Sequence, residues 1–124
     1  MTLNVLEGSF ALVRLPGDAP VPAWFASARR FASLTRVPGE LSLLLDAEVV
    51  PAGLAVRDDY RGLRVADVLP ISSVGIMAGL SSTLAAAGVA LLPIATHDTD
   101  YVFVFAADLP MALDALSAAG HAIG

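Results

Sequence analysis

The stretch Gly88-Val89-Ala90-Leu91-Leu92-Pro93-Ile94-Ala95-Thr96-His97-Asp98-Thr99-Asp100-Tyr101-Val102-Phe103-Val104-Phe105 decides the fold of this chain. Two apolar runs rich in Val, Leu, Ile and aromatic residues flank a polar His-Asp-Thr-Asp cluster. This pattern is typical of a β-hairpin whose turn carries many side-chain acceptors.

The segments on either side of the hairpin complete a mixed pattern. Residues 63–69 have strand composition, and a charge-free helical segment follows them, for which Ser72 or Ser73 is the expected N-cap and Gly88 the residue past its end. Its buried face should carry the apolar residues at helical spacing, which are Ile76, Leu80, Leu84 and Ala87. Asp108 should begin a second helix that buries Leu109, Leu113 and Leu116 and ends at Gly120, and residues 121–123 fit a short edge strand. Together these elements spell βαββαβ, the ferredoxin-like arrangement.

The first half predicts a related but incomplete pattern. Residues 3–15 read as extended, residues 21–29 as a short helix that buries Val21, Phe25 and Ala28, and residues 31–36 and 41–46 as strands. The apolar pattern weakens between Pro51 and Gly62, which we interpret as the joint. We therefore predict an α+β chain of two ferredoxin-like halves, residues 1–56 (βαββ) and residues 57–124 (βαββαβ), with helices on one face of each sheet.

Composition limits the classes of function. The chain has 124 residues, of which 56% are hydrophobic, and its mean hydropathy is +0.74. A chain this small has a limited interior, so we expect some of these apolar residues to lie in a subunit interface and the protein to be a homodimer. The absence of cysteine excludes disulfides, thiolate metal sites and thiol catalysis. The N-terminal residues lack the basic and apolar regions of a secretory signal, so a cytoplasmic location is expected.

Charge is distributed unevenly. The net charge of −5 argues against nucleic acid as a partner. All seven basic residues are arginines at or before Arg64, and only acidic residues follow. A site in the second half would lie in a negative field that favours a cationic group on the ligand, although a solvated acidic surface explains the same pattern. Residues 68–96 carry no aspartate, glutamate, lysine or arginine, but prolines, serines and glycines interrupt them, so no membrane-spanning helix is predicted.

The first candidate binding site is the loop that leads into the first helix of the second half. It comprises Ser72, Ser73, Val74, Gly75 and Ile76. A helix N-terminus offers unpaired amides and a partial positive charge, which suit a ligand carboxylate. Many helix starts bind nothing, and that alternative stays open from the residues alone.

The second candidate is the hairpin turn, with Thr96, His97, Asp98 and Asp100. Asp98 or Asp100 could accept charge-assisted hydrogen bonds from an ammonium or guanidinium group. Alternatively, the aspartates bond their own backbone in an Asx-type turn. A metal site formed by His97, Asp98 and Asp100 is a weaker rival, because neighbouring strand positions point to opposite faces. No nucleophile-elbow motif or paired carboxylates stand out, so no metal, cofactor or catalytic residue is predicted.

Several motifs also resemble a known family. Thr96-x-Asp98-Thr99-Asp100-Tyr101-Val102, entered through Gly88-Val89 and preceded by Gly75-Ile76, is similar to the pattern G-I-x-I-x-A-I-S-T-x-D-T-D-Y-V of bacterial ACT-domain proteins related to the CASTOR-type arginine sensors. Further motifs of the first half follow in the family's order: Arg14-Leu15-Pro16, Val21-Pro22-Ala23-Trp24, Phe31-x-Ser33-Leu34-Thr35-Arg36 and Glu40-Leu41-Ser42. There are departures: Ser72, Ser73 and Val74 stand where the family has an acidic residue and a threonine, His97 replaces an aromatic residue and Ala95 a serine.

The resemblance implies a small regulatory module that binds an amino acid and is not an enzyme. It implies that the loop before the helix contacts the ligand and that Thr96 and Asp100 lie at the pocket. We therefore expect the ligand carboxylate at residues 73–76 and its ammonium group near Thr96 and Asp100. The alternative is an oligomerisation or protein-interaction module with a vestigial pocket.

Overall fold

The computed structural model describes residues 1–124, and its contacts divide the chain into two compact units. One unit contains residues 7–60, and the other combines residues 1–6 with residues 61–124. The division predicted from sequence, 1–56 and 57–124, stays a prediction. The compact units have different bounds because the N-terminal strand is grouped with the second half of the chain.

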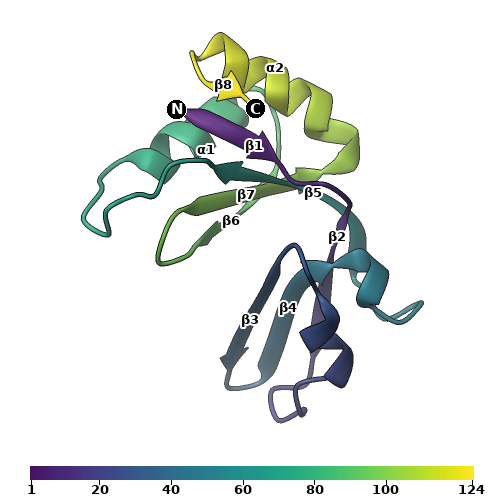
Figure 1. Ribbon diagram of the computed structural model, residues 1–124. Coiled ribbons are helices and arrows are strands. Elements are labelled where there is room, and N and C mark those ends of the chain that lie inside the picture. Colours follow the sequence, from purple (N-terminus) through teal and green to yellow (C-terminus); the bar gives the residue numbers. More distant parts are fainter. The chain divides into compact units, whose positions relative to one another are not determined.

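The unit of residues 1–6 and 61–124 has the predicted βαββαβ order, with one additional N-terminal strand (Figure 1). Its elements are β1 (Thr2–Val5), the end of β5 (Arg57–Val65), α1 (Ile76–Ala86), β6 (Leu91–Ala95), β7 (Asp100–Phe105), α2 (Leu109–Ala118) and β8 (Ala122–Ile123). The strands follow the order β6-β7-β5-β1-β8. Strand β1 is antiparallel to β5, with Leu3 opposite Val65, and parallel to the edge strand β8. The mixed α+β, ferredoxin-like fold is thereby confirmed.

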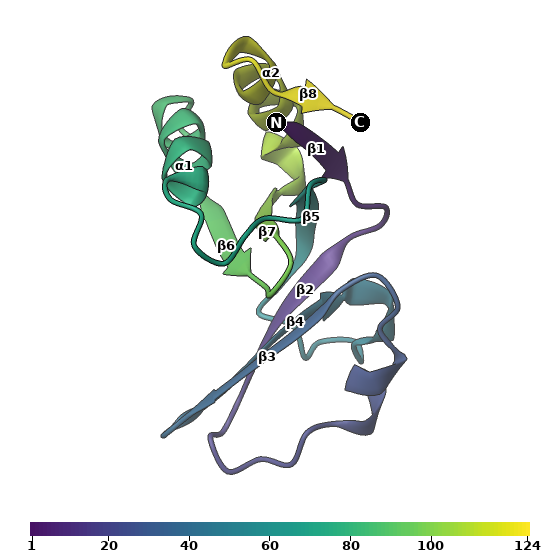
Figure 2. The same ribbon diagram turned by 60° about the vertical axis from the view of Figure 1, so that its left-hand side comes forward.

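Helices α1 and α2 lie side by side on one face of this sheet (Figure 2). The core between the sheet and these helices contains residues of three strands, the loop after α1 and both helices, which are Leu3, Leu63, Val65, Leu80, Leu84, Val89, Val102, Val104, Ala112 and Leu116. Ile76, Ala87, Leu109 and Leu113 pack against it with partial burial. The helical faces predicted from spacing are therefore correct, and the helices cover the sheet as expected.

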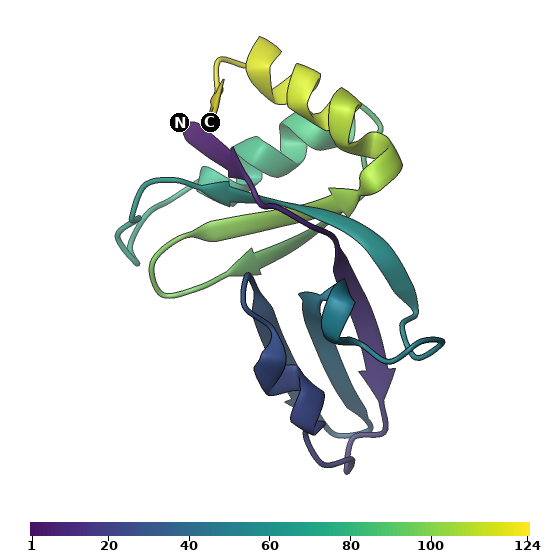
Figure 3. The ribbon, with the colours of Figure 1, turned by 45° about the vertical axis from the view of Figure 1, so that its right-hand side comes forward.

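The predicted hairpin is present with an antiparallel register that pairs Leu91 with Val104 and Ala95 with Asp100 (Figure 3). Gly88, at φ 76°, has the left-handed conformation expected after a helix. Two boundaries differ from the prediction. Strand β5 begins at Arg57, inside the expected joint, and ends at Val65 instead of continuing to residue 69. Beyond Val65 the chain leaves the strand, and the amide of Leu69 donates to the carbonyl of Asp98 in the hairpin turn instead of to a neighbouring strand.

The unit of residues 7–60 is built on a sheet of order β3-β4-β2-β5. Its strands are β2 (Phe10–Leu15), β3 (Ala32–Val37), β4 (Glu40–Asp46) and the start of β5. Its core contains Val13, Leu41, Leu43 and Leu45. The segment expected to be extended, residues 3–15, forms two strands, β1 and β2, because the chain bends between them at Gly8, which has φ 80°.

The predicted helix over residues 21–29 is only a short 3₁₀ helix, Ala23–Ser27. Phe25 and Ala28 pack on the core as expected, but Val21 is exposed. The reason lies in the buried carboxylate of Asp46, which accepts hydrogen bonds from the main-chain amides of Arg29, Arg30 and Phe31. Those amides cannot also continue a helix, so the chain enters β3 instead.

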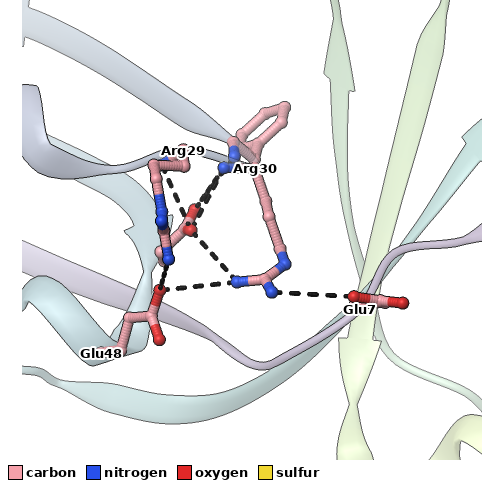
Figure 4. A network of polar contacts seen from close by, with 6 residues as sticks. Glu7, Arg29, Arg30 and Glu48 are labelled. Carbon is pink, nitrogen blue, oxygen red and sulfur yellow. Dashed lines mark hydrogen bonds and ion pairs between the residues drawn. The ribbon is translucent and has the colours of Figure 1, made fainter.

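Arginine side chains extend this contact into a small network (Figure 4). The guanidinium of Arg30 lies 3.7 Å from Glu7, 3.9 Å from Asp46 and 3.4 Å from Glu48, and that of Arg29 lies 3.7 Å from Glu48. Asp46 is 2% exposed, whereas Glu7 and Glu48 are largely in solvent. The buried carboxylate therefore holds the start of β3 against the end of β4, and the outer charges add little.

Candidate functional site

A cavity of about 410 Å³ lies between the start of α1 and the turn of the β6–β7 hairpin. We call this cavity the site pocket. One wall comes from the loop after β5 and the first turn of α1, with Leu69, Pro70, Ile71, Ser73, Gly75, Ile76, Met77 and Ala78. The other wall comes from the hairpin, with Ala95, Thr96, His97, Thr99 and Asp100. The loop and the hairpin turn lie at the same end of the sheet (Figures 1 and 3).

The first wall is shaped by two local features of the backbone. The amide of Ser73 donates to the carbonyl of Pro70 at 2.9 Å, which closes a turn. Gly75 then adopts φ 83° and ψ 2° and occupies the N-cap position of α1, with no side-chain cap. The expected N-cap at Ser72 or Ser73 was therefore wrong, because the Pro70–Ser73 turn ends before the helix begins.

The absence of a capping side chain leaves the helix start open. The first α-helical bond of α1 runs from the amide of Gly79 to the carbonyl of Gly75. The amides of Ile76, Met77 and Ala78 precede it and have no partner within the helix, and all three residues line the site pocket. Together with the helix dipole, these amides form a seat for an anionic group.

The second wall is held by two threonines. The amide and hydroxyl of Thr96 donate to the carbonyl of Thr99 at 2.9 and 3.0 Å, which closes the hairpin turn. Thr99 is 2% exposed, and its hydroxyl donates to the carbonyl of Val65 at 2.8 Å. A further bond of 2.7 Å runs from the amide of Leu69 to the carbonyl of Asp98. These bonds fix the hairpin turn to the segment that forms the first wall.

Asp100 faces the helices. It lies two residues before Val102, whose side chain is in the core between sheet and helices, and strand residues two apart share a face. Its carboxylate has no hydrogen-bond or ion-pair partner in the chain and is the only carboxylate among the lining residues. The site pocket thus places an unpaired carboxylate opposite an open helix start.

The predicted site residues divide into two groups. Six of them line the site pocket together, namely Ser73, Gly75, Ile76, Thr96, His97 and Asp100. The other three, Ser72, Val74 and Asp98, are exposed and lie outside its lining. Nδ1 of His97 lies 2.8 Å from Asp98, and both side chains are largely in solvent. No group of three or more His, Cys, Asp or Glu side chains is arranged to hold a metal ion.

Sequence reasoning missed several lining residues. Met77 and Ala78 would have followed from a helix start placed at Ile76 instead of Ser72 or Ser73. No local pattern marked Thr99, because its position depends on the hydrogen bond from its hydroxyl to the carbonyl of Val65. For Leu69, Pro70 and Ile71 the sequence carried no signal, because their position depends on the bond from Leu69 to Asp98.

The two α-helices are too short to form a membrane-spanning segment.

Comparison with known families gives a match of residues 55–118 to the ACT domain. The chain belongs to the ACT-domain family. The matched region contains α1, the hairpin and all of α2, so it includes both walls of the site pocket.

Solved structures extend the likeness of this ACT-domain chain to both units. A protein of Agobacterium tumefaciens is 28% identical, with a TM-score of 0.91 over 99% of this chain and 91% of that one. A Vibrio cholerae protein of unknown function is 23% identical, with a TM-score of 0.74 over 94% and 88%. The ligand-free regulatory subunit of aspartate kinase from Thermus thermophilus shares the fold, with 17% identity and a TM-score of 0.63 over 95% and 94%. No curated protein matches the sequence.

Proposed function

We propose that this ACT-domain protein is a non-catalytic regulatory module that binds a small amino acid in the site pocket. The observation that carries the proposal is the pairing of opposite electrostatic features across one cavity. The open amides of Ile76, Met77 and Ala78 suit a carboxylate, and the unpaired Asp100 suits an ammonium group. An amino-acid zwitterion has both groups on one carbon atom.

The volume of the site pocket and the negative charge of the surrounding sequence support the same class of ligand. A volume of about 410 Å³ is at the lower end of the range of small-molecule sites, which is about 300–1,000 Å³. After Arg64 the chain contains aspartates but no arginine or lysine, so the cationic end of the ligand would lie in a negative electrostatic field. Ligand occupancy would bias the docking of two subunits if the two docked states differ in affinity for the ligand.

Structural similarity to a regulatory subunit is consistent with this role. One structural neighbour is described as the regulatory subunit of aspartate kinase. We also propose the closer relation to the CASTOR-type sensors that the motif around Thr96 and Asp100 suggests. That relation concerns the family and does not by itself make arginine the ligand.

Thermal-shift measurements against the twenty amino acids test the proposal. At about 100 times Kd, a ligand that binds only the folded state adds about 2.7 kcal/mol to the free energy of unfolding. We expect at least one amino acid to raise Tm in a concentration-dependent manner. If none does so at millimolar concentration, the binding function is wrong.

A second candidate is an interaction module whose pocket is vestigial. It is favoured by three large apolar side chains that the loop after β5 exposes to solvent, Val68 at 70%, Ile71 at 81% and Val74 at 92%. Such exposure is typical of an interaction surface, and a homodimer is the partner we propose. Sedimentation analysis showing a dimer, together with no response to amino acids, would favour this candidate.

A further inference from the structure

We infer that the ligand of the site pocket is an amino acid with an uncharged, apolar side chain, such as leucine or methionine. This inference rests on the proposed function and adds the class of side chain. It follows from the charges and polar groups that remain in the pocket once the zwitterion's two charged ends have been assigned.

The lining offers no partner for a charged side chain. It contains no arginine or lysine, so the side-chain carboxylate of aspartate or glutamate would have no arginine or lysine to pair with. The nearest arginine in sequence, Arg64, donates to the Tyr101 hydroxyl and the Ala66 carbonyl. A basic ligand meets the opposite shortage: Asp100 is the single carboxylate of the lining, and the ammonium and guanidinium groups of arginine would compete for it.

The hydroxyl groups of the second wall are also engaged within the chain. That of Thr96 donates to the carbonyl of Thr99, and that of Thr99 donates to the carbonyl of Val65. Nδ1 of His97 is paired with Asp98. A buried polar group that gains no hydrogen bond costs free energy, so polar ligand side chains are disfavoured at this wall.

Apart from the Ser73 hydroxyl and Nε2 of His97, the side chains that remain in the lining are apolar. Leu69, Ile71, Ile76 and Met77 line the first wall, and Ala95 lines the second. Contact with these side chains removes apolar surface from water, and this stabilises a ligand in proportion to its own apolar area. Met77 is well suited to such contact because its unbranched thioether adapts to ligands of different shape.

Calorimetric titration of the full chain with leucine, methionine, glycine, arginine and aspartate tests the inference. Glycine measures the contribution of the zwitterion alone. We expect leucine or methionine to bind at least about tenfold more tightly than glycine, and arginine and aspartate to bind no better than glycine. Tighter binding of arginine or aspartate, or equal affinity for glycine and leucine, would overturn the inference while the proposed function stands. Binding of none of the five, with no Tm response in the wider panel, would overturn both.

A matched pair of variants separates the pocket wall from general effects. Met77→Ala removes apolar contact in the site pocket, and Met111→Ala makes the same change on α2, outside the lining. We expect Met77→Ala to weaken leucine binding by about fivefold and leave glycine binding unchanged. Met111→Ala should leave both unchanged. Equal loss for glycine and leucine in Met77→Ala would contradict a role for this wall in selecting the side chain.

Discussion

The main-chain amide of Leu69 donates a hydrogen bond of 2.7 Å to the main-chain carbonyl of Asp98. This bond joins the loop before α1 to the turn of the β6–β7 hairpin, and Thr99 adds a second link through its bond to Val65. Both walls of the site pocket are therefore fixed to each other before any ligand arrives. A preformed pocket avoids the entropic cost of ordering loops upon binding.

Asp100→Asn should remove most of the stabilisation that an amino acid provides, because the neutral amide cannot form a charge-assisted bond with the ammonium group. Asp98→Asn is the matched control, since it makes the same change two residues away and outside the lining. The ligand-dependent rise in Tm of each variant is the measurement. An unchanged response in Asp100→Asn would reject this residue as the ammonium partner.

Gly75→Ala should destabilise the fold by about 1 kcal/mol, because a residue with a Cβ is strained at φ 83°. The added Cβ would meet no atom within 4 Å, so crowding does not contribute. Gly79→Ala is the control: it lies inside α1, also has open space, and should stabilise the protein by about 0.5–1 kcal/mol. Urea unfolding of both variants compares the two. Stabilisation by Gly75→Ala would contradict the strained N-cap.

Thr99→Val should cost about 1–3 kcal/mol, because the buried Val65 carbonyl loses its hydroxyl partner while the side-chain volume is retained. Thr99→Ser keeps the hydroxyl and should lose less. Denaturant unfolding gives both values. If Thr99→Val were as stable as the native chain, the link between the hairpin and β5 would not contribute to stability.

Asp46→Ala should be among the most destabilising single changes in the unit of residues 7–60, at about 3 kcal/mol or more. It leaves the amides of Arg29, Arg30 and Phe31 without their acceptor, and part-buried Arg30 loses a charge partner. Glu48→Ala removes an exposed partner of the same arginines and should cost less than about 1 kcal/mol. Equal losses of stability in the two variants would contradict the central role of the buried carboxylate.

The sequence predicted the parts of the fold that depend on local patterns. The period of Leu80 and Leu84, the hairpin around His97 and the glycine after α1 each have a signal within a few residues. The sequence-based predictions were wrong where groups distant in the sequence form hydrogen bonds with main-chain amides. Asp46 accepts hydrogen bonds from the amides of Arg29, Arg30 and Phe31, so the helix cannot continue through Arg29. The carbonyl of Asp98 accepts a hydrogen bond from the amide of Leu69, which lies in the expected extension of β5.

In the candidate site, too, the residues with a local sequence signal were predicted and those placed by distant contacts were not. Local chemistry identified both loops, and the fold brings Gly75, Ile76, Thr96 and Asp100 to one cavity. The apolar wall was not foreseen. The position of Ile71 depends on the bond between Leu69 and Asp98, and Met77 was missed because the helix start was expected at Ser72 or Ser73 instead of Ile76.

Two-dimensional amide NMR of the ¹⁵N-labelled chain, titrated with the amino acid that raises Tm most, tests the central claim most directly. We predict that the amide resonances of residues 76–78 and 96–100 shift together and saturate with one Kd, because one zwitterion contacts both walls of the site pocket. Saturable shifts confined to one wall, or clustered away from both, would contradict the account.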